Sequence, residues 1–477
     1  MKNKKIAIAM TGIIPSSIEK LIKEIDEKKK GIMQERQKNT LTFILNQLPF
    51  KNDIVAAGGE IYAVGGIVRD AIMGKPSDDL DIVVRGIPYE QLFKILQKHG
   101  KPTDTSVTNE EGTKDFGATK FVASSSEFNK LLSKSGIRRD IDVMLPRKDS
   151  KNVNEKGHRS IKSDVNHMFT IFDDLLRRDI TINAVALDLK GNIIYNGTSL
   201  QDIKNGIIKA VSEDAFIEDP LRMIRAIRFA ARFNYQWDER TLELIKNNAH
   251  LLADKRELPK ERFLMEFEKM IGKSDMGRAI KLLVELDLYK YMFGIEHKPD
   301  EKWYHEFDSV KNVADFSYLL FKDVDPKNII SLIEKNITNN TSTLKYVQAI
   351  INYNTKIKDK ELDLIGRINE LANVYNLSMD MLSTSIFVLD SDREIADKFK
   401  NGDLPAGVND IAFKGEDFKN FIIDAVRNSG REFNEKTDSY KMGIAKKMAI
   451  QAIYKGDLKN DKEQIKNFLS KNSTFFI

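Results

Sequence analysis

Residues 62–84 read YAVGGIVRDAIMGKPSDDLDIVV, and this stretch decides how the rest of the chain is interpreted. One apolar segment runs into Gly65 and Gly66, and a second opens with Asp79 and Asp81. The pattern predicts a strand, a turn, a helix, a turn and a strand. Carboxylates two residues apart on a strand project from the same face, and burying them unpaired is costly. The sequence therefore predicts that something cationic neutralises this pair.

A third carboxylate follows in a later strand. Residues 118–146 contain two further predicted strands, ATKFVASSS and RDIDVMLP, and the second carries Asp142 between apolar neighbours. If that strand lies beside the one that begins near Asp81, three carboxylates converge on one spot, which bound cations make tenable. Oxygen ligands favour Mg²⁺, with Mn²⁺ as the alternative.

The glycine pair predicts a phosphate site. Glycines between a strand and a helix that starts near Val68 let backbone N–H groups approach a phosphate closely, and the helix N-terminus favours negative charge. A phosphate cradle beside a carboxylate metal site is what phosphoryl or nucleotidyl transfer needs. A DxD pair by itself is more often a solvated loop or a helix cap, but here GG, VRD and DxD follow one another.

Composition narrows the class of protein. The chain has 477 residues, 41% hydrophobic and 31% charged, which is ordinary for a soluble protein of several domains. It has no cysteine, which excludes disulfides, thiolate nucleophiles and cysteine zinc sites, and its net charge of +5 is a weak hint of a nucleic-acid partner. No apolar run is long enough to span a membrane, and the basic start MKNKKIAIAMTGIIPSS has no cleavage site in the usual place. We predict a cytoplasmic protein with no membrane partner.

The pattern changes along the chain. Residues 16–50 mix charged and apolar residues at helical spacing, and residues 148–164 are polar without periodicity, which predicts a mobile loop. ITINAVALDL and NIIYN form the last predicted strand pair, with Gly191 in the turn. From about Leu200 the pattern is helical to the end.

GGIVRDAIMGKPSDDLD resembles the signature of the class II nucleotidyltransferase superfamily, specifically of tRNA CCA-adding enzymes and bacterial poly(A) polymerases. The resemblance implies an α+β fold: a polymerase beta-like head with a mixed sheet, then an all-helical neck, body and tail. The divisions that follow are the head (51–190), the neck (191–272), the body (273–404) and a tRNA-binding tail (405–477). The helical spacing of residues 16–50 predicts a helical N-terminal extension (1–50), which the resemblance does not cover.

Two arginine-rich segments extend the resemblance. LLRRDITINAVALDLKGNIIYNGTSLQDIKNGIIKAV (175–211) is similar to the second and third motifs, with Ile180 where phenylalanine is usual. EDPLRMIRAIRFAARF (218–233) is similar to the base-selecting motif EDxxR. An acceptor on Asp219 and donors on Arg222 complement an amino group beside an unprotonated ring nitrogen, as cytosine and adenine present it. Asp219 and Arg222 are three residues apart and are expected on one face of one helix, so the alternative is a salt bridge within that helix, worth about 0.2–0.5 kcal/mol.

The resemblance assigns roles to particular residues. It implies catalytic carboxylates, with the first two as metal ligands: Asp79, Asp81 and Asp142. It implies that the nucleotide contacts a second set: Gly65, Gly66, Arg69, Asp70, Arg178, Asp179, Asn183, Asp219, Arg222, Arg225 and Arg228. PKERFLMEFEKMI (259–271) is similar to the fifth motif, but Arg262 and Glu266 are placed to pair with each other, so they stay outside the catalytic set.

The implied activity is addition of CCA, or part of it, to tRNA 3′ ends from CTP and ATP without a template. The acceptor arm of tRNA is the implied partner, because IAFKGEDF (411–418) and MGIAKKMAIQAIYKGDLKNDKEQI (442–465) resemble the tail of CCA-adding enzymes. The alternatives are a poly(A) polymerase, a CC-only or A-only enzyme, an idle RNA-binding protein, or an enzyme that modifies proteins or small molecules. The oligomeric state stays open between monomer and homodimer.

Overall fold

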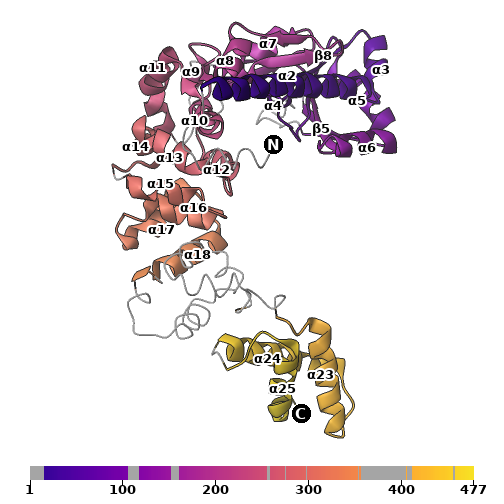
Figure 1. The fold of residues 1–477 in the computed structure, drawn as a ribbon, viewed down its shortest axis with the longest axis vertical. Coiled ribbons are helices and arrows are strands. Elements are labelled where there is room, and N and C mark those ends of the chain that lie inside the picture. Colours follow the sequence, from indigo (N-terminus) through magenta and orange to yellow (C-terminus); the bar gives the residue numbers. More distant parts are fainter. Residues whose placement is uncertain are drawn as a thin grey trace. The chain divides into compact units, whose positions relative to one another are not determined.

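A computed structural model describes residues 16–105, 118–151, 161–254, 258–273, 275–296, 298–352, 354–355, 404, 411–454 and 457–476. The chain divides into two compact units, shown as a ribbon in Figure 1. The first unit comprises Met1–Pro259 and Leu286–Tyr291, and the second comprises Lys260–Glu285 and Met292–Ile477. The catalytic residues predicted from the sequence all lie in the first unit.

The first unit contains a seven-stranded mixed sheet in the order β3-β4-β5-β2-β1-β8-β9. Its strands are β1 (Glu60–Val64), β2 (Asp81–Arg85), β3 (Gly100–Asp104), β4 (Ala118–Ala123), β5 (Asp140–Met144), β8 (Val185–Asp188) and β9 (Ile193–Tyr195). Strands β2 and β5 run parallel, with Asp81 opposite Asp142, whereas the other neighbours in the sheet are antiparallel. The predicted mixed sheet, and the pairing of the two strands that carry aspartates, are confirmed.

Helices of the first unit pack around this sheet. They are α2 (Ser16–Asn46), α3 (Lys51–Ala56), α4 (Gly66–Ile72), α5 (Tyr89–His99), α6 (Ser126–Lys134) and α7 (Ile171–Leu176). The long helix α2 lies along α4, and its Leu41, Ile44 and Leu45 are buried. The last turns of α2 therefore belong to the hydrophobic core of the head, because burial of three large apolar side chains stabilises that contact.

The turn between β1 and α4 depends on glycine. Gly65 has φ +71°, a conformation that L side chains rarely adopt, and its N–H donates to the Val185 carbonyl at 2.9 Å. A Cβ at this position would lie 2.6 Å from Nη1 of Arg178. The helix begins at Gly66, two residues before the predicted start near Val68.

The segment 148–164 is only partly the loop that the sequence predicts. Strands β6 (Arg147–Lys151) and β7 (Ile161–Val165) pair antiparallel, so the prediction is wrong at both ends of the segment. Backbone hydrogen bonds form this hairpin without apolar periodicity, which is why the pattern did not reveal it. Residues 152–160, including the GHR sequence, lie outside the described residues.

Short elements complete the first unit. They are the 3₁₀ helices η2 (Thr181–Asn183) and η3 (Ala249–Ala253), the helices α8 (Ser199–Asn205), α9 (Ala215–Glu218), α10 (Leu221–Phe233) and α11 (Glu239–Asn248), and the strands β10 (Ile207–Ile208) and β11 (Gln236–Trp237). Helix α10 lies largely in the interior, since ten of its thirteen residues are buried. The parallel pair β10–β11 is the exception to the prediction that the chain is helical after Leu200.

The second unit is helical where the structure describes it. Its first part contains α12 (Lys260–Glu268), α13 (Met276–Glu285), η4 (Glu301–Trp303), α15 (Tyr304–Phe307), α16 (Val313–Phe321), α17 (Pro326–Asn336) and α18 (Thr341–Asn352), and α14 (Leu288–Phe293) joins the two units. The tail contains α23 (Gly415–Asn428), α24 (Glu435–Tyr454), α25 (Lys462–Lys471) and η6 (Ser473–Phe476) around its own core. Among the described residues, no helix is both long and apolar enough to cross a membrane.

Candidate active site

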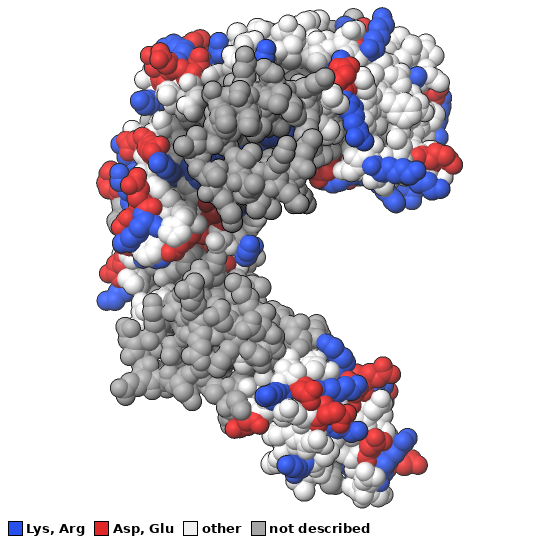
Figure 2. All heavy atoms as spheres, in the orientation of Figure 1, with Lys and Arg blue, Asp and Glu red and all other residues white. Residues whose placement is uncertain are grey.

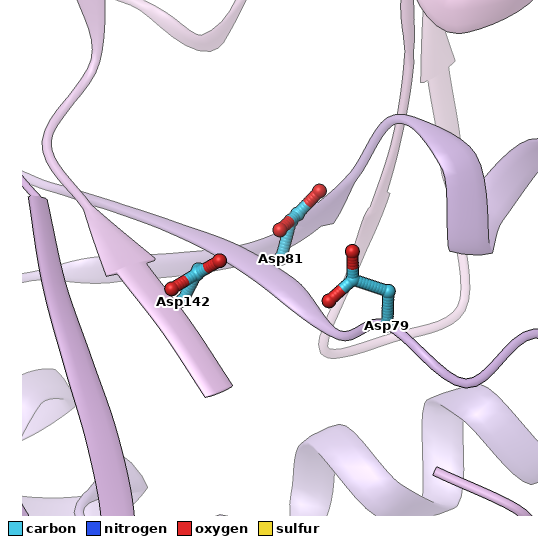
Figure 3. A group of neighbouring side chains, drawn as sticks. All are labelled: Asp79, Asp81 and Asp142. Carbon is cyan, nitrogen blue, oxygen red and sulfur yellow. The ribbon is translucent and has the colours of Figure 1, made fainter. Parts of the chain in front are cut away.

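Three carboxylates converge at one end of the β2–β5 strand pair. Asp81 is the first residue of β2, Asp142 lies opposite it on β5, and Asp79 precedes β2 by two residues. One carboxylate oxygen from each lies within 4.8 Å of the others, and Figure 3 shows the side chains arriving from these three positions. The expectation that Asp79 lies on the strand is wrong, but the convergence of the three carboxylates is as predicted.

The electrostatics of this aspartate trio suit a divalent cation. Burial, followed by the neighbouring charge of Asp79, raises the pKa of Asp81 to about 6. Burial also raises the pKa of Asp142. Neighbouring carboxylates disfavour each other's ionisation, and a bound cation stabilises their ionised forms. A ligand set made only of oxygen atoms fits Mg²⁺ or Mn²⁺. The residues present therefore fit the predicted metal.

Two cations that the sequence analysis did not single out lie beside the trio. Arg138, between α6 and β5, hydrogen-bonds to Asp79. Lys120 on β4 lies 3.1 Å from Asp140 and 4.0 Å from Asp142, nitrogen to oxygen. Lys120 could have been found from the register of β4 against β5, in which it is directly opposite Asp142. Arg138 lies in a loop, where strand periodicity gives no signal.

Arg178 lies next to the glycine turn, where a triphosphate is predicted. Its Nη2 donates to Oδ2 of Asp174 at 2.9 Å, and Arg177 donates to the other oxygen at 2.9 Å. Burial alone would raise the pKa of Asp174, but the two arginines outweigh it and lower the pKa to about 2. Asp174 is therefore a fixed anion that orients Arg178 toward Gly65.

Arg69, the other predicted phosphate ligand, is enclosed by protein. Its side chain is buried and donates to Asp70 at 2.9 Å and to Asn183 at 2.5 Å. Its guanidinium also lies over the rings of Phe229 and Phe233, 5.1 and 4.8 Å from their centroids. Burial lowers the pKa of Arg69. The structure thus places Arg69 as a link between α4 and α10.

Asp179 is buried and fully paired. Its Oδ1 accepts from the N–H of Ile180 at 2.9 Å and from Asn183 at 3.0 Å, and its Oδ2 accepts from Arg225 at 2.8 Å. Burial would raise the pKa of Asp179, but Arg225 and Asn183 outweigh it and hold the pKa well below its usual range. Five of the predicted nucleotide contacts thus form one connected group, which we call the buried network: Arg69, Asp70, Asp179, Asn183 and Arg225.

The predicted base-selecting pair lies where α10 begins. The helix starts at Leu221, so Asp219 precedes it and accepts from the N–H of Leu221 at 3.1 Å, which corrects the expectation of one shared helix. Arg222 is buried and donates to Glu218 at 2.7 Å. Glu218 was not among the predicted residues, although its spacing of four from Arg222 could have revealed it. Arg228, also predicted, is buried with its guanidinium 4.2 Å from the Phe229 ring centroid.

Comparison with protein families and with curated relatives agrees with this geometry. Residues 61–209 match the Poly A polymerase head domain, and residues 234–298 match a family described as "Probable RNA and SrmB- binding site of polymerase A". A CCA-adding enzyme of Ligilactobacillus salivarius is 31% identical over 358 residues, which cover 70% of this chain and 79% of the relative. One of Streptococcus mutans is 29% identical over 380 residues, covering 75% and 86%.

Solved structures share the fold. The CCA-adding enzyme of Bacillus stearothermophilus in complex with CTP aligns with a TM-score of 0.56 at 22% identity, covering 92% of this chain and 98% of that one. The Thermotoga maritima CCA-adding enzyme complexed with tRNA aligns with a TM-score of 0.54 at 18% identity, covering 91% and 95%. The mixed head sheet with its aspartate trio defines a nucleotidyltransferase. More narrowly, the chain belongs to the family of CCA-adding enzymes.

Proposed function

We propose that this nucleotidyltransferase adds CCA to the 3′ ends of tRNA, using CTP and ATP and no template. The convergence of Asp79, Asp81 and Asp142 beside the glycine turn carries the proposal. The 3′-hydroxyl of the RNA attacks the α-phosphate of the nucleotide, a new phosphodiester bond forms, and pyrophosphate leaves. A tRNA substrate also favours a cytoplasmic location.

Asp79, Asp81 and Asp142 would hold Mg²⁺ or Mn²⁺. When bound, such a cation supplies Lewis-acid activation of the hydroxyl and stabilises the departing pyrophosphate. The protein's own contribution is to hold three like charges together. Backbone pairing of β2 with β5 fixes Asp81 opposite Asp142, and this pairing offsets part of the repulsion between the carboxylates.

The triphosphate lies against the turn at Gly65 and Gly66, with Arg178 as its main cationic contact. Arg178 suits this role because Asp174 fixes one edge of its guanidinium, while its side chain keeps 16% of its surface exposed. The buried network acts differently. Its members satisfy one another, so we assign them the task of holding α4, η2 and α10 in register around the nucleotide.

Asp219 and Arg222 select the base. A carboxylate accepts hydrogen bonds and a guanidinium donates them, so together they match cytosine or adenine and leave uracil or guanine unsatisfied. Glu218 supports this choice because it holds one guanidinium nitrogen of Arg222 at 2.7 Å, which limits the directions in which the others donate. Pairing of protein side chains with the base removes the need for a template.

The tail is suited to bind RNA phosphates. Its helices α24 and α25 expose lysines at positions 447, 466 and 471, and Figure 2 shows basic side chains interspersed with acidic ones on the visible face of this region. Lysine contacts to phosphates position an RNA without reading its sequence. The tail then recognises tRNA by shape.

The test uses three tRNA transcripts that end at the discriminator base, after CC, and after CCA. Each is incubated with the full chain, Mg²⁺, and CTP or ATP singly and together. The proposal predicts that the first accepts two C residues and one A, the second accepts one A, and the third accepts nothing. Long A tails would assign the chain to poly(A) polymerases. Incorporation of only C or only A would make it a specialist.

A further inference from the structure

Arg138 is fixed beside the aspartate trio by the protein backbone. Its N–H donates to the carbonyl of Asp78 at 2.8 Å, which ties the loop after α6 to the segment before β2. This bond involves no side chain, so the glutamine and lysine variants used below keep it. Figure 2 shows basic and acidic side chains intermixed on the visible face of the α6 region.

The side chain of Arg138 binds the carboxylate of Asp79, one of the three proposed to be catalytic. Its Nη2 hydrogen-bonds to Oδ1 of Asp79, and its Nε lies 3.8 Å from Oδ2 of Asp78. Asp79 therefore has two cationic partners: this guanidinium and, under the proposed function, the metal. A guanidinium and a divalent cation cannot share one carboxylate oxygen without strong mutual repulsion.

The contact is exposed enough to be reversible. The side chains of Arg138 and Asp79 keep 48% and 51% of their surface exposed, and ion pairs in such surroundings are weak. Asp78, 73% exposed, offers Arg138 a second carboxylate when Asp79 turns away. Arg138 can thus release Asp79 and remain near the trio.

We propose that Arg138 is a built-in counter-ion that competes with the divalent metal for Asp79. In the metal-free protein it neutralises part of the trio, and it yields when a cation binds. Arg138 therefore raises the metal concentration at which the site fills. The inference rests on the proposed function in one respect, namely that Asp79 is a metal ligand.

Lys120, on β4, places a second positive charge near the aspartate trio. Its Nζ lies 4.0 Å from Oδ1 of Asp142 but only 3.1 Å from Oδ2 of Asp140, so its main partner is outside the trio. Since electrostatic interactions weaken with distance, Lys120 has a smaller effect than Arg138 on a cation held by the trio.

The test is Mn²⁺ binding to the full chain, measured by electron paramagnetic resonance of free Mn²⁺, which does not depend on turnover. Arg138→Gln removes the competing charge, and we expect binding to tighten about 3- to 10-fold at low ionic strength. Arg139→Gln is the matched control, because this exposed neighbour carries the same charge and has no contact with the trio among those found in the structure. Arg138→Lys keeps the charge and should bind within about twofold of the wild type.

Thermal unfolding gives a second readout. Without metal, Arg138→Gln should melt at a lower temperature than the wild type because the trio loses its counter-ion. Saturating Mn²⁺ should remove that difference, since a ligand that binds only the folded state adds stability that grows with the logarithm of its affinity, and the variant binds it more tightly.

The outcomes separate this inference from the proposed function. Unchanged or weaker Mn²⁺ binding in Arg138→Gln would overturn the inference, and so would equal tightening in Arg138→Gln and Arg139→Gln. In either case, loss of Mn²⁺ binding in the double variant Asp79→Asn/Asp81→Asn would leave the proposed metal site standing. If the wild-type chain bound no Mn²⁺ at millimolar concentration, the metal site and the inference would fall together.

Discussion

The aspartate trio and the buried network lie in the same unit and use similar charged residues, yet their electrostatics are opposite. In the trio, burial and mutual repulsion raise the pKa of Asp81 to about 6, and the cation beside Asp79 is half-exposed. In the buried network, Asp179 accepts three hydrogen bonds, and its arginine and asparagine partners hold its pKa low. The charges of the trio need a bound cation to compensate them, whereas the charges of the buried network compensate one another.

The difference separates catalysis from architecture within one set of sequence motifs. Charges left uncompensated in a folded protein cost stability, and functional sites are where such a cost is retained. Charges that are buried and fully paired fix a geometry instead. Substitutions in the two regions should therefore have opposite effects on stability, which gives the comparison its tests.

The largest effect is expected at the trio. Asp142→Asn should lower the rate of nucleotide incorporation by at least about 10³-fold, because it removes one of the negative charges that hold the divalent cation needed for the reaction. The free energy of unfolding should stay the same or rise, because burial raises the pKa of this carboxyl in the wild type. Initial rates with labelled CTP and urea unfolding measure the two quantities. Asp140→Asn, on the same strand but outside the trio, is the control and should lose less than about tenfold in rate.

The buried network should respond in the opposite way. Asp179→Asn leaves Arg225 without its buried anion and should lower the free energy of unfolding by about 3 kcal/mol. Urea unfolding followed by circular dichroism measures it, with Asp214→Asn as an exposed control in the same unit. A variant as stable as the wild type would show that Asp179 does not hold the network and would remove the contrast with the trio.

Base selection should weaken when Arg222 is removed. Arg222→Ala should reduce the preference for CTP and ATP over UTP and GTP by about 10²-fold, because the hydrogen bonds that this guanidinium donates to a correct base no longer distinguish it from a wrong one. Glu218→Gln should have a smaller effect in the same direction, since it only loosens the orientation of Arg222. Competition assays with all four nucleotides measure both variants. Full selectivity in Arg222→Ala would contradict the assignment.

The smallest effect concerns pH. The pKa of Asp174 is about 2 in the folded protein, below the value of about 3.9 for an unpaired aspartate. The unfolded state therefore binds more protons in this window, so the stabilisation is complete above about pH 4 and is lost as pH falls toward 2. It amounts to about 2–3 kcal/mol. Urea unfolding between pH 3 and 6 should show a shallower pH dependence for Asp174→Asn than for the wild type, and parallel curves would argue against the ion pairs.

The sequence predicted the trio because its chemistry is local. Alternation of apolar and polar residues identifies the strands that carry or follow Asp79, Asp81 and Asp142, and clustered carboxylates require those strands to be neighbours. The structure adds the parallel direction and the register that sets Asp81 opposite Asp142, which the sequence pattern did not give. The strands of the head and the helical remainder were predictable from periodicity along the chain, whereas the mixed sheet was what the family resemblance implied.

The roles of single arginines were not predictable in this way. Arg69 reads as a phosphate ligand in its motif, but Phe229 and Phe233, which enclose it, come from α10 much later in the chain. Arg138 approaches Asp79 because a backbone hydrogen bond draws its loop to Asp78. Tertiary contacts decide which of many arginines are free to bind a ligand, and periodicity carries no information about them.

The most direct test of the account is the product ladder from a tRNA transcript that lacks CCA, resolved to single nucleotides. The wild-type chain and the double variant Asp79→Asn/Asp81→Asn are each incubated with CTP, ATP and Mg²⁺. The account predicts that the wild type adds C, C and A and then stops, while the variant, folded and still able to bind tRNA, adds nothing. Addition at an undiminished rate by the variant would contradict the claim that the aspartate trio is the catalytic centre.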